Sequence, residues 1–257
     1  MDHDFEDVEI KINAPELLEI ALKGKRKKCM IATGAMSDPY IPINESLKLT
    51  RSCLEIIEKY GYGLAIQTKS NLIMRDIDLL IKINKNAKCV VQITLTTFDE
   101  SLCRILEPNV CTTRDRFEVL KKMHDNGIAT IVWLCPLLPF INDNMENIRG
   151  ILDYCIEAKV YGILCFGMGM TLREGDREYY YAMLDRHFPA LSSLYKKRFG
   201  NSYIITSDND SELMTYFQKT CAENDLIYDK DSLFGFMSTL DKKKEYWQQE
   251  LFSLSPF

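Results

Sequence analysis

Polar side chains follow or end three apolar runs of this sequence. They are a hydroxyl and a carboxylate after the first run, an ammonium after the second and a hydroxyl near the tip of the third, namely Ser37, Asp38, Lys69 and Thr94. The lysine can pair with a carboxylate or a phosphate, and the other three offer hydrogen-bonding oxygens to a ligand. Each also has a purely structural interpretation: a Ser-Asp-Pro turn, a solvated loop cation, and a β-branched residue typical of strands.

A second group of candidate residues lies further along the chain. Glu107 is a loop carboxylate that could act with Asp38 as an acid–base pair. Arg173 and Arg177 could clamp an acidic group of a substrate, and Tyr179 could line its pocket. The alternative is a capped helix whose apolar positions pack on the barrel, and these positions are Tyr180, Leu184 and Phe188.

Alternating strand and helix patterns must position these residues. Short apolar runs begin at residues 29, 63, 89, 129 and 161, and segments with helical periodicity follow them, except perhaps the last. This alternation predicts an α/β fold with parallel strands and right-handed crossovers. Because α/β proteins place ligand sites at the carboxyl ends of parallel strands, we expect the four strand-end residues to face a common cavity.

The strand pattern stops after residue 167. Residues 211–224 have a helical pattern, and the remaining segment is weakly patterned. We therefore expect a barrel-like domain over residues 1–205 and a helical C-terminal extension over residues 206–257 that packs on one face. Near the start, residues 8–12 read as a short strand or a lead-in to a helix that Asn13 caps.

Composition limits the classes of partner. The 257 residues contain 32 Lys and Arg against 37 Asp and Glu, a formal net charge of −5. This balance gives no global positive field for nucleic acid or an anionic membrane, although the basic run 25–28 could form a local patch or simply a solvated helix end. The sequence has no apolar run of membrane-spanning length and an acidic start unlike a signal peptide, so we expect a cytoplasmic protein.

The nine cysteines indicate reduced thiols. Most lie within apolar or amphipathic runs, as core thiols of a reducing compartment do. No two are spaced as C-x2-C or C-x3-C, so the sequence contains no local metal motif.

The order of the strand-end residues resembles the radical S-adenosylmethionine (SAM) superfamily, within it the group related to spore photoproduct lyase. The similar segments are 33–40, 68–70, 94–97, 106–108, 136–143, 166–168 and 171–173. The resemblance implies a partial (β/α)6 TIM-like barrel. Its cofactors would be SAM and a [4Fe-4S] cluster.

The resemblance also implies roles for individual residues. Ser37 and Asp38 would hold the amino group of SAM, Lys69 would pair with its carboxylate, and Thr94 would stand at the ribose. The turn that ends at Pro139 would lie near the adenine edge. Of the second group, we expect Glu107, Arg173 and Tyr179 to lie near the substrate.

This sequence departs from the family pattern at one point. The family binds its cluster with C-x3-C-x2-C in the loop after the first strand, and that loop is not in this sequence. We therefore expect the first βα unit to be wholly or partly missing and this chain alone not to be catalytically competent. The run 29–33 would then be an exposed strand edge, partly covered by residues 8–12, which favours self-association or docking of a separate cluster-bearing segment.

Three functions remain open from the sequence. The first is the SAM-binding domain of a lyase-like radical enzyme that cleaves SAM to a 5′-deoxyadenosyl radical with a cluster supplied by another segment, on an unknown substrate. The second is a non-catalytic, truncated remnant that binds a small molecule or a partner. The third is a metal-free barrel enzyme that uses Asp38 and Glu107 as acid and base.

Overall fold

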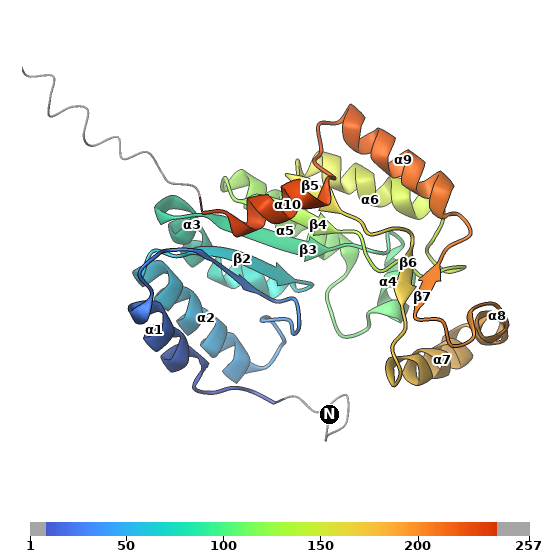
Figure 1. Cartoon of the computed structure of the whole chain (residues 1–257), viewed down its shortest axis with the longest axis horizontal. Helices are drawn as coiled ribbons and strands as arrows, with labels where there is room; N and C mark the ends of the chain where they lie inside the picture. Colours follow the sequence, from blue (N-terminus) through green and yellow to red (C-terminus); the bar gives the residue numbers. More distant parts are fainter. Residues whose placement is uncertain (1–8, 241–257) are drawn as a thin grey trace, which may run out of the picture.

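Five parallel strands form the centre of the protein. The computed structural model describes residues 9–240. Its main sheet contains, in this order, β1 (Met30–Thr33), β2 (Gly63–Thr68), β3 (Cys89–Thr94), β4 (Ala129–Trp133) and β5 (Gly162–Leu164) (Figure 1). Each neighbouring pair is parallel, and one further parallel bridge joins Gly162 to Ile227. The predicted α/β fold, a partial barrel of parallel strands, is confirmed.

Helices precede or connect these strands. They are α1 (Ala14–Gly24), α2 (Asn44–Lys59), the 3-10 helix η1 (Asn71–Asp76), α3 (Ile77–Asn86), α4 (Glu100–Leu106), α5 (Thr113–Asp125) and α6 (Met145–Glu157). Side-chain caps fix the starts of four of them, because Ser70, Asp99, Thr112 and Asn144 each accept a hydrogen bond from a backbone N–H in the first turn. Asn13 precedes α1 as predicted, but its side chain makes no capping hydrogen bond.

The two-residue period of the strands separates two cores. In β3, Val91 and Ile93 are fully buried in the larger core with the helices. Val90 points to the opposite, inner face and belongs to a smaller cluster. Helix α10 (Lys230–Ser238) covers part of the inner face by packing Leu233 and Met237 into this cluster (Figure 1).

The chain after β5 builds a C-terminal lobe, which we define as residues 169–206. It contains β6 (Gly169–Thr171) and β7 (Ile204–Thr206), which pair antiparallel, and α7 (Asp176–His187) and α8 (Pro189–Phe199) between them. The lobe has its own small core of Leu172, Leu184, Tyr195 and Ile205. Helix α9 (Asp210–Glu223) then returns to pack on α6.

Several local predictions differ from the structure. The sequence patterns missed α4, α8, β6 and β7, which are short or lack a clear apolar period. The positions Tyr180, Leu184 and Phe188 pack in the core of the C-terminal lobe and not on the five-stranded sheet. The division into residues 1–205 and 206–257 stays a prediction, and β7 spans its boundary.

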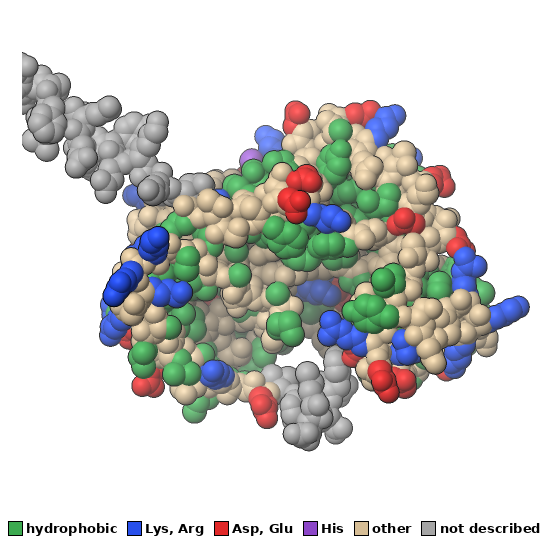
Figure 2. Space-filling model, in the orientation of Figure 1, with side chains coloured by type: hydrophobic (Ala, Val, Ile, Leu, Met, Phe, Trp, Pro, Cys, Tyr) green, Lys and Arg blue, Asp and Glu red, His purple; other side chains and the backbone are tan. Residues whose placement is uncertain are grey.

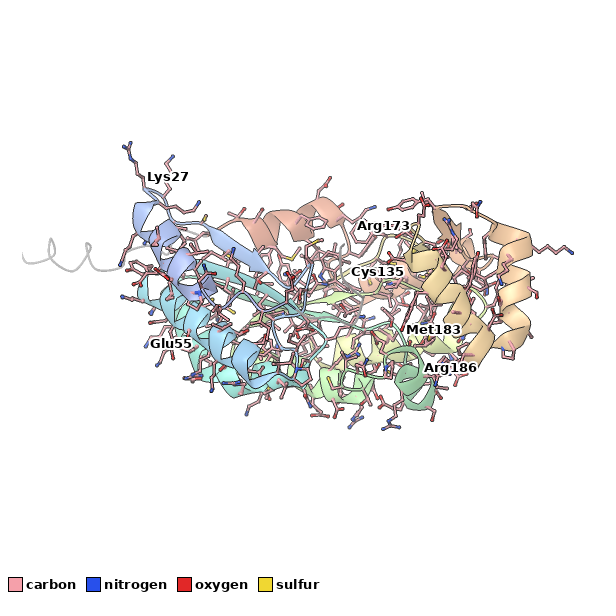
Figure 3. All side chains as sticks on the ribbon, turned by 90° about the horizontal axis from the view of Figure 1, so that it is seen from below. Lys27, Glu55, Cys135, Arg173, Met183 and Arg186 are labelled. Atoms are coloured by element: carbon pink, nitrogen blue, oxygen red, sulfur yellow. The ribbon has the colours of Figure 1, made fainter. Side chains whose placement is uncertain are left out.

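The start of the described chain is not a strand. Residues 9–12 have no strand pairing, and Val8 lies outside the described residues. The basic run follows α1 at the surface, where Lys27 extends away from the body of the protein (Figure 3). No helix within residues 9–240 combines the length and the apolar character needed to cross a bilayer.

Candidate ligand site at the carboxyl ends of the strands

A cavity of about 640 Å³ lies on the inner face of the sheet. It is bounded by β1 and the loop after it, by the inner faces of β2, β3 and β4, and by α10; the lining residues are Met30, Ala32–Ser37, Ala65, Gln67, Gln92, Trp133, Phe234, Met237 and Ser238. Figure 2 shows the protein hollowed between the part with α1 and α2 and the part with α7 and α8. None of the lining side chains carries a formal charge.

The loop after β1 approaches β2 so closely that only glycine fits at its first position. Gly34 has a φ of +97°, and a Cβ added there would lie 1.9 Å from the carbonyl oxygen of Gln67. The loop therefore lies directly against β2. Three residues further on, Ser37 is exposed and lines the cavity.

The Asp38 carboxylate ties this loop to the end of β2. It accepts hydrogen bonds from the Thr68 hydroxyl at 2.6 Å, the Lys69 backbone N–H at 2.7 Å and the Tyr40 backbone N–H at 2.9 Å. These three donors hold the carboxylate in one orientation. A carboxylate has about four acceptor positions, so about one remains for another donor.

The Lys69 side chain belongs to a partly buried charge network. Its Nζ lies 2.5 Å from Oε1 of Glu107, whose Oε2 accepts a hydrogen bond from Arg116 at 2.8 Å. The Arg116 side chain is fully buried, whereas 38% of the Lys69 side chain is exposed. Burial alone would raise the pKa of Glu107, but the two cations outweigh it and hold the pKa below its ordinary value.

Arg116 extends this network to the end of β3. Its guanidinium donates to the Thr94 carbonyl at 3.0 Å and to the Cys111 carbonyl at 3.0 Å. Hydrogen bonds thus connect Asp38 to the Lys69 backbone and the Lys69 ammonium to Glu107. Arg116 then connects Glu107 to the Thr94 carbonyl. Asp38 and Glu107 meet cations and backbone N–H groups rather than each other, which does not support their use as an acid–base pair.

The other predicted residues lie elsewhere. Pro139 is buried, and its carbonyl accepts a hydrogen bond from the Tyr195 hydroxyl at 2.6 Å. Arg173 is exposed in the loop between β6 and α7 (Figure 3). Tyr179 lines a separate groove of about 520 Å³ between α4 and α7. Of the predicted site residues, only Ser37 lines the cavity on the inner face.

Sequence reasoning missed the polar floor of this cavity. Gln67 and Gln92 are register partners on β2 and β3, and both line it. The indole N–H of Trp133 donates to Oε1 of Gln92 at 2.9 Å. A signal was present, because each glutamine interrupts an otherwise apolar strand.

The described residues do not fit a [4Fe-4S] cluster. Within residues 9–240, no group of three or more His, Cys, Asp or Glu side chains is arranged to hold a metal ion. The cysteines are free, and burial raises the pKa of Cys135 and of Cys165 to about 11, which keeps both thiols protonated at neutral pH.

Comparison with solved structures supports the fold. Spore photoproduct lyase complexed with dinucleoside spore photoproduct aligns with a TM-score of 0.55 and 11% identity, over 84% of this chain and 65% of that one. A variant of that lyase with bound AdoMet and the same dinucleoside gives a TM-score of 0.56 and 13% identity over the same shares. At these identities the likeness shows the fold alone.

Sequence relatives come from archaea, bacteria and a virus. Protein MJ0683 of Methanocaldococcus jannaschii is 35% identical over 56% of this chain and 52% of its own length. Rv2578c of Mycobacterium tuberculosis is 26% identical over 76% and 57%, and ORF301 of Acidianus two-tailed virus is 30% identical over 58% and 49%. This chain therefore spans about half the length of the curated relatives it matches. The family model of the radical SAM superfamily matches residues 5–155, more than half of the chain, and this protein belongs to that superfamily.

Proposed function

We propose that this protein binds SAM in the cavity on the inner face of the sheet, as the SAM-binding part of a radical SAM enzyme. The observation that carries the proposal is a single cavity of about 640 Å³ that joins the loop after β1 to a polar floor of two glutamines. Its volume lies in the range of small-molecule sites, and one side of it is the loop at the carboxyl end of β1, the kind of place where α/β proteins bind ligands.

The charged end of SAM would meet the loop and the charge network. Asp38 has about one acceptor position left for the ammonium group, and the exposed Ser37 hydroxyl lies beside it in the chain. The Lys69 ammonium uses one of its three N–H groups on Glu107, so it can also donate to the carboxylate of SAM. Thr94, at the end of β3, would serve the ribose.

The chemistry of the family requires a [4Fe-4S] cluster, which residues 9–240 do not supply. In this proposal the cysteine ligands come from another polypeptide segment. Spore photoproduct lyase, a structural neighbour, binds a dinucleoside, which makes a nucleic acid one candidate substrate.

Isothermal titration of the protein with SAM tests the proposal. We expect saturable binding by the wild type and at least tenfold weaker binding by Lys69→Ala, because a hydrogen bond between charged groups contributes about 1.5–3 kcal/mol. Lys82→Ala, which removes an exposed lysine of α3, is the matched control and should bind as the wild type does. No saturable heat with the wild type, or equal binding by Lys69→Ala, would refute the proposal.

A further inference from the structure

The groove between α4 and α7 is separate from the cavity on the inner face of the sheet, and we call it the α4–α7 groove. Its volume is about 520 Å³, and its apolar lining includes Ile105, Leu106, Leu138, Ile141, Met183 and Leu184. Ile105 is 44% exposed although it is a large apolar side chain. Apolar surface left open in a concave region is typical of a site that a partner covers.

The side chains of α7 reach this groove from one face of the helix. Tyr180, Met183 and His187 follow each other at intervals of three and four residues, so they project on the same side. Figure 3 shows Met183 and Arg186 on the part of α7 that lies next to α4. Two helices therefore form the long walls of the groove.

The lining of the groove carries positive charge without a counter-charge. Arg104 and Arg186 line it from α4 and α7, and no aspartate or glutamate lines it. Both arginines are exposed, and neither forms an ion pair within residues 9–240. The carboxylates nearest to them in the chain are already engaged, since Glu107 pairs with two cations and Asp185 pairs with Lys196 at 3.7 Å. The charge of the groove is therefore complementary to an anionic partner.

The two arginines also suit the helices that carry them. Each lies in the last turn of its helix, where a cation complements the helix dipole. That role accounts for the charges but not for the apolar surface between them.

The aliphatic lining favours a polypeptide over a nucleic acid as the occupant. Of the three aromatic side chains in the groove, Tyr180 packs on Tyr195 with ring centroids 5.5 Å apart, and Phe188 packs in the core of the C-terminal lobe. Tyr179 remains, and a single ring does not provide a platform on which successive bases stack. The formal net charge of −5 also opposes a polyanion. Aliphatic surface between two helices, by contrast, is complementary to the apolar face of an amphipathic helix.

We propose that the α4–α7 groove docks an amphipathic helical segment of a partner protein, with acidic side chains beside its apolar face. The apolar side chains enter the groove, and the carboxylates pair with Arg104 and Arg186. Leu106 and Pro108 line the groove on either side of Glu107, so the docked partner lies next to the network that holds Lys69. This proposal goes beyond SAM binding and does not depend on it.

Fluorescence anisotropy with two labelled helical peptides tests the proposal on the full chain. The first peptide has leucines at positions i, i+3, i+4 and i+7 and glutamates elsewhere, and the second has lysines in place of the glutamates. We expect the wild type to bind the glutamate peptide saturably and the lysine peptide at least tenfold more weakly. Tenfold corresponds to about 1.4 kcal/mol, roughly the contribution of one hydrogen bond between charged groups.

Charge reversal tests the two arginines. The double variant of Arg104→Glu with Arg186→Glu should bind the glutamate peptide at least tenfold more weakly than the wild type and the lysine peptide more tightly. Both side chains are exposed, so we expect the variant to keep its fold, which circular dichroism checks. Lys82→Glu, at an exposed lysine of α3 outside the groove, is the matched control and should bind both peptides as the wild type does.

Two further measurements test the apolar lining. Ile105→Ala should weaken binding of the glutamate peptide at least threefold, because less apolar surface is then covered. Ile12→Ala removes an isoleucine that is 78% exposed and outside the groove, and it should have no effect. In NMR spectra of the wild type, the peptide should shift the methyl signal of Met183 and leave that of Met36, which is exposed in the loop after β1, unchanged.

The proposal is overturned if the glutamate peptide does not bind saturably, if the wild type binds both peptides equally, or if the charge reversal leaves binding unchanged. A peptide that binds without shifting the Met183 signal docks elsewhere, which also overturns it. A single-stranded oligonucleotide that binds the wild type but not the double variant, while the glutamate peptide does not bind, would make the groove a nucleic-acid site instead.

Discussion

Glu107 neutralises a buried guanidinium that has no other carboxylate partner among the described residues. Its carboxylate lies between Arg116, which is fully buried, and Lys69, which is partly exposed. We expect Glu107→Gln to lower the free energy of unfolding by about 3 kcal/mol, because the Arg116 charge then stays buried without a counter-charge. Urea unfolding measures this loss.

The matched control is Lys69→Met. It should lower the free energy of unfolding by less than about 1 kcal/mol, because the Lys69 side chain is 38% exposed and the pair of Glu107 and Arg116 remains. Equal losses in the two variants would show that Glu107 does not carry the buried guanidinium.

The same carboxylate predicts a pH dependence. Burial raises the pKa of Glu107, but Lys69 and Arg116 lower it further, so its pKa in the folded protein lies below the ordinary value of about 4.3. A lowered carboxyl pKa contributes stability that is full above the unfolded pKa and is lost as the pH falls through the folded pKa. The difference in unfolding free energy between wild type and Glu107→Gln should therefore be constant above about pH 5.5 and shrink at lower pH. A difference that grew on acidification would contradict this sign.

Gly34 fixes the loop that borders the cavity. In Gly34→Ala the new methyl group would meet the Gln67 carbonyl, and alanine would have to adopt a φ of +97°. We expect a loss of more than about 1 kcal/mol in unfolding free energy and weaker SAM binding. Gly24→Ala is the control, because a Cβ there meets no atom within 4 Å. Thermal unfolding of both variants measures the loss. A Gly34→Ala variant as stable as the wild type would show that the close approach to Gln67 does not require glycine.

At the scale of elements, one side chain anchors the C-terminal lobe to the turn after β4. Tyr195 of α8 is fully buried, donates to the Pro139 carbonyl and accepts a hydrogen bond from the Tyr180 hydroxyl at 3.1 Å. Tyr195→Phe should lower the free energy of unfolding by about 1–2 kcal/mol, since it leaves buried polar groups unpaired. Tyr203→Phe, at an exposed tyrosine of the same lobe, should have no effect. If both variants melt like the wild type, the anchor does not stabilise the lobe.

Helix α10 forms although the local sequence pattern gives little indication of a helix. The segment after residue 224 is weakly patterned, and it was predicted only as part of a helical C-terminal extension over residues 206–257, without the bounds of a helix. It nevertheless forms a helix, because Asp229 caps its start and Leu233 finds the inner face of the sheet. The Lys88 ammonium also donates to the carbonyls of Phe236 and Thr239 at its end. Tertiary packing here outweighs a weak local pattern.

At the scale of the whole protein, the sheet has one open edge among the described residues. β1 pairs with β2 only, and the bond from Gly63 N–H to the Cys29 carbonyl shows that Met30 and Ala32 direct their backbone groups away from β2. We expect the amide protons of Met30 and Ala32 to exchange faster than those of Val91 and Ile93 in the central strand β3. Hydrogen exchange read by NMR measures all four.

The same experiment tests the proposal of self-association through this edge. Exchange at Met30 and Ala32 that slows as the protein concentration rises would indicate pairing between copies. Protection equal to that of β3 at every concentration would contradict an open edge and indicate that another strand covers it.

The sequence by itself determined the alternation of the five parallel strands with the helices between them, although α4 was missed, and the resemblance of its strand-end residues pointed to the family. Those features follow from local periodicity and from residues at strand ends, such as Asp38 and Lys69, whose place in the chain fixes the edge of the sheet they occupy. Asp38, Lys69 and Thr94 are connected in space through Glu107 and Arg116, whereas Ser37 lies on the wall of the cavity outside this network. Arg116 was missed because arginine on a helix is usually solvated, and here it is fully buried.

Only the tertiary structure decided what surrounds the cavity. The strands are apolar on both faces, so their sequence pattern does not tell which face packs on the helices. Only the structure therefore shows that Gln67 and Gln92 lie side by side on the inner face. Trp133, Phe166 and Phe234 come from three separate elements and meet because α10 folds back over the sheet. Contacts between segments so far apart depend on how the whole chain packs, and the local periodicity of the sequence does not predict them.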